Sequence, residues 1–461
     1  MSSENATDRL KQFVLGDQEL ADPDWPVDHV PMNERKGLWS ISAVLLGFVF
    51  FAGTIYSGAA VGAALGFGQL LQAMAVGYAI LGVYVAILCA IAAKAGLTAV
   101  LLSRYTFGRF GAKWADLLLG GTQVGWFGVT IPMVAVPTAE FFNINTPMWV
   151  SFLILLWGIL HLSSAYIGYD GMEILSKIAV PALVLIGVLS IAIALLDVGG
   201  FGGLFGSSSA EMGFGAAVTA VVGTFVSGGT QAPNWARFAR NQKVAFWAGL
   251  IAFLLGNGFL FFSGAVGGTA YNVTPAGDLY QVLAVQGLAG LGLIALILNV
   301  WTTNDNAAYA FGVAGSEAFG IKQKRPFVLA GGAIGIMLAL LGVSDALSPY
   351  LGLLGQYIPP LGGVLIADYL LCWKLQIPRM EDVEFVGVRY SGITAYLVGC
   401  AVAALTAGAL FPGIGLPSVI PGIAALNGII VAMVAHTVLF YGLEKRGLLP
   451  GHHVEDDAEY C

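Results

Sequence analysis

Apolar stretches of about 20 residues recur along almost the whole 461-residue chain. This is the length that an α-helix needs to cross the hydrocarbon core of a bilayer. Only 10% of the residues are charged and 57% are hydrophobic, whereas soluble domains have about 25% charged residues. The sequence therefore predicts an all-α membrane protein with twelve transmembrane helices. The expected spans are Leu38–Leu65, Gln69–Ala93, Lys113–Phe141, Pro147–Ile167, Met172–Leu196, Met212–Asn234, Val244–Gly268, Gly290–Ala314, Pro326–Val343, Ala346–Leu371, Ser391–Phe411 and Ile420–Leu443.

The positions of the lysines and arginines predict the orientation of these spans. Cytoplasmic loops of membrane proteins carry an excess of basic residues. Here every basic residue lies in a tail or follows an even-numbered span, either at the join or in the first two turns of the next span, and the other joins have none. We therefore expect both termini in the cytoplasm, with residues 1–36 and 444–461 as tails and residues 37–443 as one transporter domain. The basic residues are Arg9, Lys11, Arg35, Lys36, Lys94, Arg104, Arg109, Lys113, Lys177, Arg237, Arg240, Lys243, Lys322, Lys324, Arg325, Lys374, Arg379, Arg389, Lys445 and Arg446.

The residue types that carry enzyme chemistry form no recognisable pattern in this sequence. It contains no GxSxG, P-loop or HExxH motif, and no two carboxylates are expected to face each other inside the apolar spans. The four cysteines have neither disulfide nor zinc spacing, and the basic residues form no run suited to nucleic acid. His161 and His436 are isolated, so we expect packing roles, and His452 followed by His453 is expected to be a solvated end. The polar first 36 residues predict no cleavable signal peptide.

Two spans contain residues that interrupt helices. The first has Gly47, Gly53 and Gly58 through its middle, and the sixth runs from Gly223 through two further glycines to Pro233. In lipid, backbone groups released by such breaks are tolerated only beside protein or a wet cavity. Two interrupted helices five apart in order are typical of an inverted-repeat transporter with a binding site at the membrane midplane. The alternative is that glycine-rich helices only pack closely.

Spans three and eight carry polar residues that are expensive in lipid and usually face a bundle interior. Gln123 and Trp126 are three residues apart, so they share a helix face. Thr302 and Thr303 follow Asn299 by three and four residues, which places two hydroxyls near its carbonyl. With carbonyls from the broken first span, they form an oxygen cage of the kind that a hard cation prefers. The alternative is that both hydroxyls bond back to their own helix.

Three motifs around these residues resemble the bacterial cytosine permeases of the nucleobase–cation symporter family, which also contains purine, hydantoin and allantoin transporters. The resemblance runs from about Arg35 to the end of span twelve. It implies a leucine-transporter-like fold in which spans 1–5 and 6–10 are inverted repeats, with broken helices 1 and 6, in a bacterial inner membrane. The motifs are Leu119-Gly-Gly-Thr-Gln-Val-Gly-Trp-Phe-Gly128, Asn299-Val-Trp-Thr-Thr-Asn-Asp-Asn306 and Ile358-Pro-Pro-Leu-Gly-Gly-Val-Leu-Ile-Ala-Asp-Tyr369.

The resemblance also implies binding residues. It implies sodium as the coupling ion, with the carbonyls of Gly47, Phe50 and Asn299 and the hydroxyls of Thr302 and Thr303 as its ligands. For the substrate, it implies Trp126 and Phe225 on either side of the ring and Gln123 at its polar edge, completed by Phe51, Thr224, Ser227 and Asn304. Hydantoin transporters have tryptophan where this chain has Phe225, which weakens a hydantoin assignment.

We therefore expect a transporter that imports cytosine or a closely related neutral nucleobase together with sodium. Amides and hydroxyls without a fixed charge suit a neutral, planar substrate better than an amino acid or a nucleotide. One rival is a proton-coupled purine, hydantoin or allantoin permease with Asp305 or Glu140 as the proton carrier. Another is a membrane enzyme or a channel, which the absence of catalytic motifs and of a continuous polar stripe disfavours.

Overall fold

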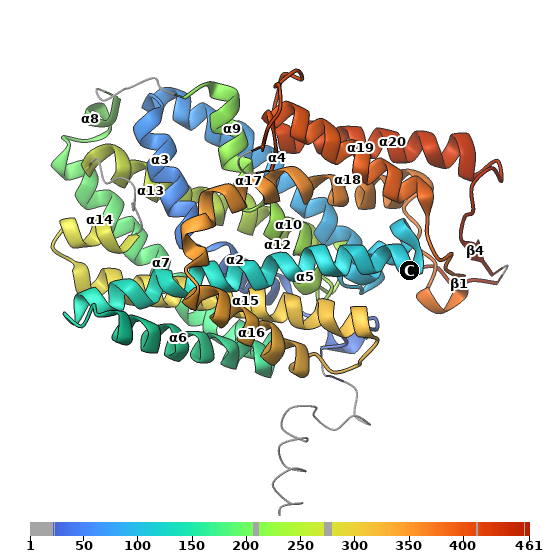
Figure 1. Cartoon of the computed structure of the whole chain (residues 1–461), viewed down its shortest axis with the longest axis horizontal. Helices are drawn as coiled ribbons and strands as arrows, with labels where there is room; N and C mark the ends of the chain where they lie inside the picture. The colour runs from blue at the N-terminus through green and yellow to red at the C-terminus, as the bar shows by residue number, and fades with distance from the viewer. Residues whose placement is uncertain (1–21, 23, 206–211, 272–278, 412–413, 456) are drawn as a thin grey trace, which may run out of the picture.

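The computed structural model describes residues 22, 24–205, 212–271, 279–411, 414–455 and 457–461, which are mainly helical (Figure 1). The α-helices are α2 Leu38–Val49, α3 Ala52–Ala64, α4 Phe67–Ala95, α5 Ala99–Phe141, α6 Pro147–Ile167, α7 Tyr169–Asp197, α8 Phe201–Phe205, α9 Phe214–Gly223, α10 Val226–Gln231, α11 Pro233–Ala236, α12 Gln242–Leu250, α13 Asn257–Tyr271, α14 Leu279–Val285, α15 Ala289–Phe319, α16 Arg325–Leu340, α17 Leu347–Tyr357, α18 Pro359–Ala367, α19 Tyr390–Ala407 and α20 Ala424–Leu439.

Short segments complete the secondary structure. The 3-10 segments are η1 Met32–Glu34, η3 Val343–Ala346 and η5 Met380–Asp382, and the π segments are η2 Ile251–Gly256, η4 Asp368–Cys372 and η6 Phe440–Glu444. The strands are β1 Val383–Glu384, β2 Ala409–Phe411, β3 Ile414–Gly415 and β4 His453–Val454. Antiparallel pairs form between β1 and β4 and between β2 and β3.

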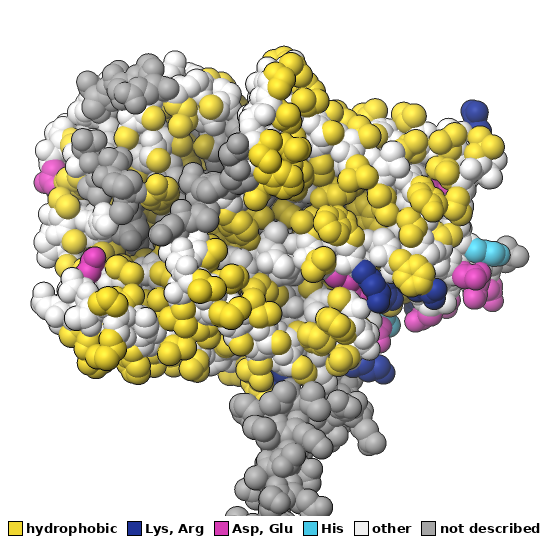
Figure 2. All heavy atoms as spheres, viewed as in Figure 1, with side chains coloured by type: hydrophobic (Ala, Val, Ile, Leu, Met, Phe, Trp, Pro, Cys, Tyr) yellow, Lys and Arg dark blue, Asp and Glu magenta, His cyan; other side chains and the backbone are white. Residues whose placement is uncertain are grey.

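Helix length and composition identify a multi-pass membrane protein. Within the described ranges, seven helices are long and apolar enough to cross a membrane, and the bent pair α2 and α3 is an eighth candidate. The seven are α4, α5, α6, α7, the run from α12 to α13, α19, and α20 with η6. Hydrophobic side chains cover much of the visible face, and its lysines and arginines gather toward the end that carries β1 and β4 (Figure 2). The other four expected spans coincide with α9–α11, α15, α16 and α17–α18, so the number twelve remains a prediction.

Both expected helix interruptions are present. Helices α2 and α3 meet at a bend of 59°, with Phe50 and Phe51 outside helical geometry between them. The second break separates α9 from α10 at Thr224 and Phe225, where Phe225 has φ −143° and ψ 12°. At the first break the carbonyls of Phe48 and Phe50 lie at the end of α2, where they face the Thr303 hydroxyl at 3.5 Å and 3.0 Å.

Close packing fixes α3 against α13. A Cβ on Gly58 would collide with the backbone of Phe261, and one on Gly264 would collide with the backbone of Ile55. Small residues permit this approach of two backbones in lipid, where dispersion contacts hold helices together. The contact brings the first turn of α13 alongside the break between α2 and α3.

Candidate functional site

Four helices from both halves of the chain, α2, α5, α10 and α15, line a small cavity together with the two helix breaks. Its volume is about 10 Å³, roughly the room that one water molecule needs. Side chains therefore fill the place where the two helix breaks face α5 and α15. The lining residues are Phe48, Phe51, Gln123, Trp126, Thr224, Phe225, Gly228 and Thr303.

Aromatic rings supply most of the cavity wall. The Phe51 ring lies edge-to-face against Trp126 at 5.0 Å between centroids, and against Phe225 at 6.1 Å. Two glycines make room for these rings, since a Cβ on Gly53 would collide with Phe51 and one on Gly228 with Phe225. Phe51 thus contacts both of the rings that were expected to hold a substrate between them.

Gln123 is the polar residue of the wall that most clearly points to a ligand. Its side chain is 1% exposed, and its Nε2 has no hydrogen-bond partner within the described part of the chain. A buried donor without an acceptor costs about 1–3 kcal/mol, so a ligand that accepts a hydrogen bond there is favoured. Among the described residues, no charged side chain lines the cavity.

The structure brings together most of the residues predicted to bind substrate. Phe51, Gln123, Trp126, Thr224 and Phe225 all line the cavity. The other two predicted residues are placed differently. Ser227 is buried on α10 but is not part of the wall.

Asn304 belongs to a neighbouring polar cluster. It accepts a hydrogen bond from the Thr130 hydroxyl and donates one to His161 Nδ1 at 3.0 Å. Both ends of its amide are therefore engaged with α5 and α6, away from the cavity wall. His161 has the packing role expected of an isolated histidine, with its ring between those of Trp157 and Trp301.

Oxygen atoms from α2 and α15 converge on the Thr303 hydroxyl. It lies 3.0 Å from the carbonyl of Phe50, 3.1 Å from that of Asn299 and 3.5 Å from that of Phe48. The Phe50 and Phe48 carbonyls are available because α2 ends here. Three of the five residues predicted to bind a cation are thus adjacent, and the Phe48 carbonyl adds an oxygen that sequence reasoning missed.

Thr302 and Gly47 lie beside this group. The Thr302 hydroxyl shares its proton between the Leu298 carbonyl at 3.0 Å and the Asn299 carbonyl at 3.1 Å. Both carbonyls belong to its own helix, which is the alternative to a cation site that the sequence left open. Gly47 packs against Thr302 and against Ser176 on α7, whose hydroxyl a Cβ on Gly47 would meet. Ser176 Oγ is buried and lacks a partner in the residues described. The sequence carried no signal for Ser176, because lone serines are common in helices.

The two acids considered as proton carriers are placed very differently. Asp305 is fully buried on α15, where Oδ1 accepts a hydrogen bond from the Asn306 amide at 3.0 Å. Glu140 is exposed near the end of α5. Of the pair, Asp305 alone lies inside the helical bundle.

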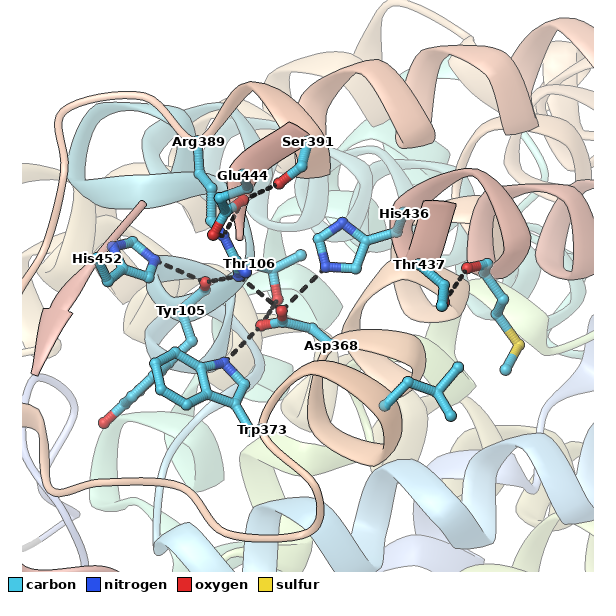
Figure 3. Close-up of polar contacts among 12 residues, drawn as sticks. Tyr105, Thr106, Asp368, Trp373, Arg389, Ser391, His436, Thr437, Glu444 and His452 are labelled. Carbon is cyan, nitrogen blue, oxygen red and sulfur yellow. Dashed lines mark hydrogen bonds and ion pairs between the residues drawn. The ribbon is translucent and has the colours of Figure 1, made fainter. Parts of the chain in front are cut away.

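A second cluster of titratable residues lies away from the cavity, where α18, α19 and α20 meet the start of α5 (Figure 3). Asp368 Oδ1 accepts hydrogen bonds from Arg389 at 2.6 Å and from His436 at 2.9 Å, and Arg389 also binds Glu444. The geometry of Asp368, Cys372 and His436 would allow a metal ion. The guanidinium on the same carboxylate oxygen opposes a cation, however, so the cluster acts as a buried ion-pair network. The sequence had indicated an isolated His436. The structure instead places this residue within the network, against Asp368.

The end of the chain folds back onto this network. His452 donates from Nε2 to the Tyr105 carbonyl at 2.8 Å (Figure 3) and accepts from the Val386 amide at 3.2 Å. The expectation that His452 is a solvated end is wrong, because pairing between β1 and β4 draws the tail against α5. His453, the next residue, is exposed as expected.

Comparison with known proteins adds independent information. The family described as "Permease for cytosine/purines, uracil, thiamine, allantoin" matches residues 29–439. The cytosine permease of Escherichia coli is 35% identical over 411 residues, which cover 89% of this chain and 93% of that protein. The hydantoin permease of Microbacterium maritypicum is 22% identical and covers 80% of this chain and 78% of that protein.

Solved structures are similar in fold. Mhp1, a nucleobase–cation symport family transporter in a closed conformation with bromovinylhydantoin bound, superposes with a TM-score of 0.76 at 18% identity, covering 94% of this chain and 97% of Mhp1. A Na⁺-coupled sialic acid symporter superposes with a TM-score of 0.69 at 12% identity, covering 96% of each chain. At 18% and 12% sequence identity, these two superpositions show a similar fold and no more.

Proposed function

The chain belongs to the family of permeases for cytosine and purines, uracil, thiamine and allantoin, and we propose that it imports cytosine, or a closely related neutral nucleobase, by symport with sodium. The observation that carries the proposal is the uncharged aromatic cavity between the two broken helices, with the unpartnered Gln123 amide in its wall. The name of the E. coli relative supports cytosine as the substrate.

Each part of the cavity has a role in this proposal. Stacking on an aromatic ring stabilises a bound base by roughly 1–3 kcal/mol but accepts any flat heterocycle. Specificity therefore falls to buried hydrogen-bonding groups, first among them Gln123. Because this cavity of about 10 Å³ is far smaller than a pyrimidine ring, we propose that the Phe51 ring moves away from Trp126 and Phe225 when the base binds. Ser227, buried on α10 beside the lining residue Gly228, remains a proposed substrate residue, and Asn304, whose amide bonds to Thr130 and His161, would take part only after a rearrangement.

Sodium is proposed to bind where α2 ends against α15. Its ligands are the carbonyls of Phe50 and Asn299 and the Thr303 hydroxyl, joined by Gly47 and Thr302. One positive charge that enters down about 100 mV supplies roughly 2.3 kcal/mol. The ion orders the end of α2 against α15, which raises the affinity for the base next to it.

The proposal extends to the arrangement in the membrane. The chain crosses a bacterial inner membrane twelve times, with spans 1–5 and 6–10 as inverted repeats and both tails, residues 1–36 and 444–461, in the cytoplasm. The two broken helices are then the first helix of each repeat. Alternating access moves one group of helices against the other around the site.

Uptake into proteoliposomes tests the proposal. Saturable uptake of labelled cytosine is expected under an inward sodium gradient, with little uptake when choline replaces sodium. Competition by uracil, adenine, hypoxanthine, hydantoin and allantoin ranks the substrates. Uptake that follows a pH gradient and ignores sodium supports the proton-coupled alternative, for which the buried Asp305 is the candidate carrier. Absence of saturable uptake of every base contradicts the transport assignment.

A further inference from the structure

A second and much larger cavity, which we call the cytoplasmic pocket, shares no residue with the cavity between the helix breaks. Its volume is about 480 Å³, which is typical of a site for a small molecule. Arg240 and Tyr460 in its wall are exposed, so solvent reaches it. Every segment of the wall lies in a tail or join that is predicted to be cytoplasmic. The wall is formed by Tyr105 and by residues 28–32 and 35, 93–97, 240–242, 379–381 and 460–461.

Three basic side chains of the cytoplasmic pocket have no carboxylate partner in the described part of the chain. They are Arg35, Lys94 and Arg240. Carbonyl oxygens accept hydrogen bonds from the first two but carry no full charge. The acidic side chains of the wall already have partners, since Asp28 pairs with His29 at 3.0 Å and Glu381 with Arg379 at 3.8 Å. The pocket therefore has an excess of positive charge.

Backbone groups hold the three unpaired cations close together. Arg35 Nη1 donates to the carbonyl of Ala93, the residue before Lys94. The amide of Arg240 donates to the carbonyl of Lys36, the residue after Arg35, at 2.9 Å. The segment before α2 thus contacts both the end of α4 and the segment after α11, and it brings one cation from each to the same cavity.

The thiol of Cys461 lies in the field of these cations. Burial raises its pKa, while the charges of Arg379, Arg35 and Lys94 act in the opposite direction. Three basic side chains from separate segments therefore lie near one atom of the wall. The carboxylate of Cys461 forms no ion pair with them in the structure described, so it does not neutralise the pocket.

The rest of the wall suits the organic part of a ligand. Val30, Met32, Leu97 and Met380 are apolar, and Tyr460 offers an aromatic ring. Guanidinium and ammonium groups are the side chains that bind phosphate. A phosphate monoester carries about −1.5 to −2 charges at pH 7 and three acceptor oxygens, which matches three convergent cations. An uncharged molecule would leave the cations unmatched, and inorganic phosphate would leave the apolar wall empty.

We propose that the cytoplasmic pocket binds a small organic phosphate of the size of a nucleoside monophosphate, and that its occupancy slows transport. The pocket joins the segments next to α2 and α11, which belong to the two broken helices, to residues 379–381 and to the end of the chain. A ligand that contacts all of them resists the relative movement of helices that alternating access requires. The effect on transport rests on the proposed function, whereas binding does not.

Binding is tested by isothermal titration calorimetry of the full chain in a neutral detergent, with cytidine monophosphate as the probe. Cytidine, which lacks the phosphate, should bind at least about tenfold more weakly, and inorganic phosphate should also bind more weakly. Arg240→Gln should weaken binding of the nucleotide about tenfold, because it removes one charged contact. Arg446→Gln removes an exposed cation outside the pocket and should have no effect. Gln123→Leu should also have none, since Gln123 belongs to the other cavity.

Two further measurements locate the ligand. The nucleotide should slow the reaction of Cys461 with maleimide about tenfold in wild type when it is present at about ten times its dissociation constant, and less in Arg240→Gln. Titration in nanodiscs separates a soluble ligand from a lipid headgroup. Affinity should be equal in phosphatidylcholine and phosphatidylglycerol. A loss confined to phosphatidylglycerol would assign the pocket to the headgroup and overturn the proposal of a soluble ligand.

The effect on transport is measured with the nucleotide enclosed in proteoliposomes. At about ten times its dissociation constant it should lower the maximal rate of cytosine uptake by up to about tenfold, and in Arg240→Gln by less than about twofold. Binding with an unchanged rate would overturn the slowing of transport. Equal affinities for nucleotide and cytidine, or equal effects of Arg240→Gln and Arg446→Gln, would overturn the site itself. Wild type without uptake of any base refutes the proposed function, and calorimetry and thiol protection then still decide whether the site exists.

Discussion

At the scale of single residues, Phe51 shows how the helix break shapes the site. Its backbone is extended, with φ −127° and ψ 132°, which turns the ring out of the axis of α3 and toward Trp126 and Phe225. A helical residue at this position would have its side chain on the helix surface. The break thus does two things: it frees the carbonyls of Phe48 and Phe50 and delivers an aromatic ring into the cavity.

Gln123→Leu should raise KM for cytosine by about tenfold or more, because the buried Nε2 then no longer donates to the base. Uptake kinetics in proteoliposomes measure the change. Thr122→Val is the matched control, since the Thr122 hydroxyl donates to the Leu119 carbonyl of its own helix at 2.8 Å and is outside the cavity wall. Full cytosine affinity in Gln123→Leu would remove this residue from the proposed specificity.

Thr303→Val should raise the sodium concentration for half-maximal uptake by about tenfold, since it deletes an oxygen beside the Phe50 and Asn299 carbonyls. The measurement is cytosine uptake as a function of sodium at constant ionic strength. Thr219→Val serves as the control, because the Thr219 hydroxyl bonds only to the Gly215 carbonyl of its own helix in the described structure. An unchanged sodium curve in Thr303→Val contradicts the assigned cation position.

At the scale of elements, the end of the chain and α5 are joined by His452. The Val386 amide donates to Nδ1 while Nε2 donates to the Tyr105 carbonyl, an arrangement that requires a neutral ring. Burial, with the nearby Arg389 guanidinium, lowers the pKa of His452 from 6.5 to about 4. The attachment is therefore complete above pH 6.5 and weakens as the pH falls toward 4, when protonation of Nδ1 breaks the bond from Val386.

A spin label on Cys461 should report this weakening as increased mobility between pH 7.5 and pH 5.5. The pKa shift corresponds to about 1 kcal/mol of lost attachment over that range. In His452→Gln the dependence on pH should disappear, whereas in His453→Gln, which alters an exposed neighbour, it should remain. The same pH dependence in His452→Gln and wild type would assign the effect to another group.

The buried network around Asp368 gives the end of the third family motif a structural role outside the cavity wall. Asp368 follows α18, and its carboxylate contacts Arg389, His436, Trp373 and Thr106 (Figure 3). It therefore joins α18, α19, α20 and α5 at one end of the bundle. Removing one partner of such a buried pair is strongly destabilising, by about 3–5 kcal/mol, because the other charge stays buried.

At the scale of the whole molecule, the distribution of basic residues makes the orientation testable. Cys461 is exposed at the end of the chain and should react with a membrane-impermeant maleimide only in inside-out vesicles. A cysteine at Asn143, in the exposed turn between α5 and α6, should react from outside intact cells. Labelling of Cys461 in intact cells would contradict the predicted topology and place the C-terminus outside the cytoplasm.

The helical membrane architecture and most of the cavity wall could be predicted from the sequence. Apolar length identified a multi-pass membrane protein, and glycines identified both breaks, because these properties act locally along the chain. Ser176 could not be found in this way. It lies in an ordinary apolar helix, and its place beside the proposed cation site follows only from its contact with Gly47, which is far away in sequence.

The sequence by itself determined that this chain lies in a membrane, where its helices break and which family it belongs to. These properties follow from the hydrocarbon thickness, from backbone preferences and from motifs of consecutive residues. Only the tertiary structure decided that Phe51 occupies the space between Trp126 and Phe225, that Asn304 turns away from the cavity and that His452 is held against α5. Those outcomes depend on which side chains meet across helices, and the pairing of distant polar groups is set by three-dimensional packing rather than by spacing along one helix.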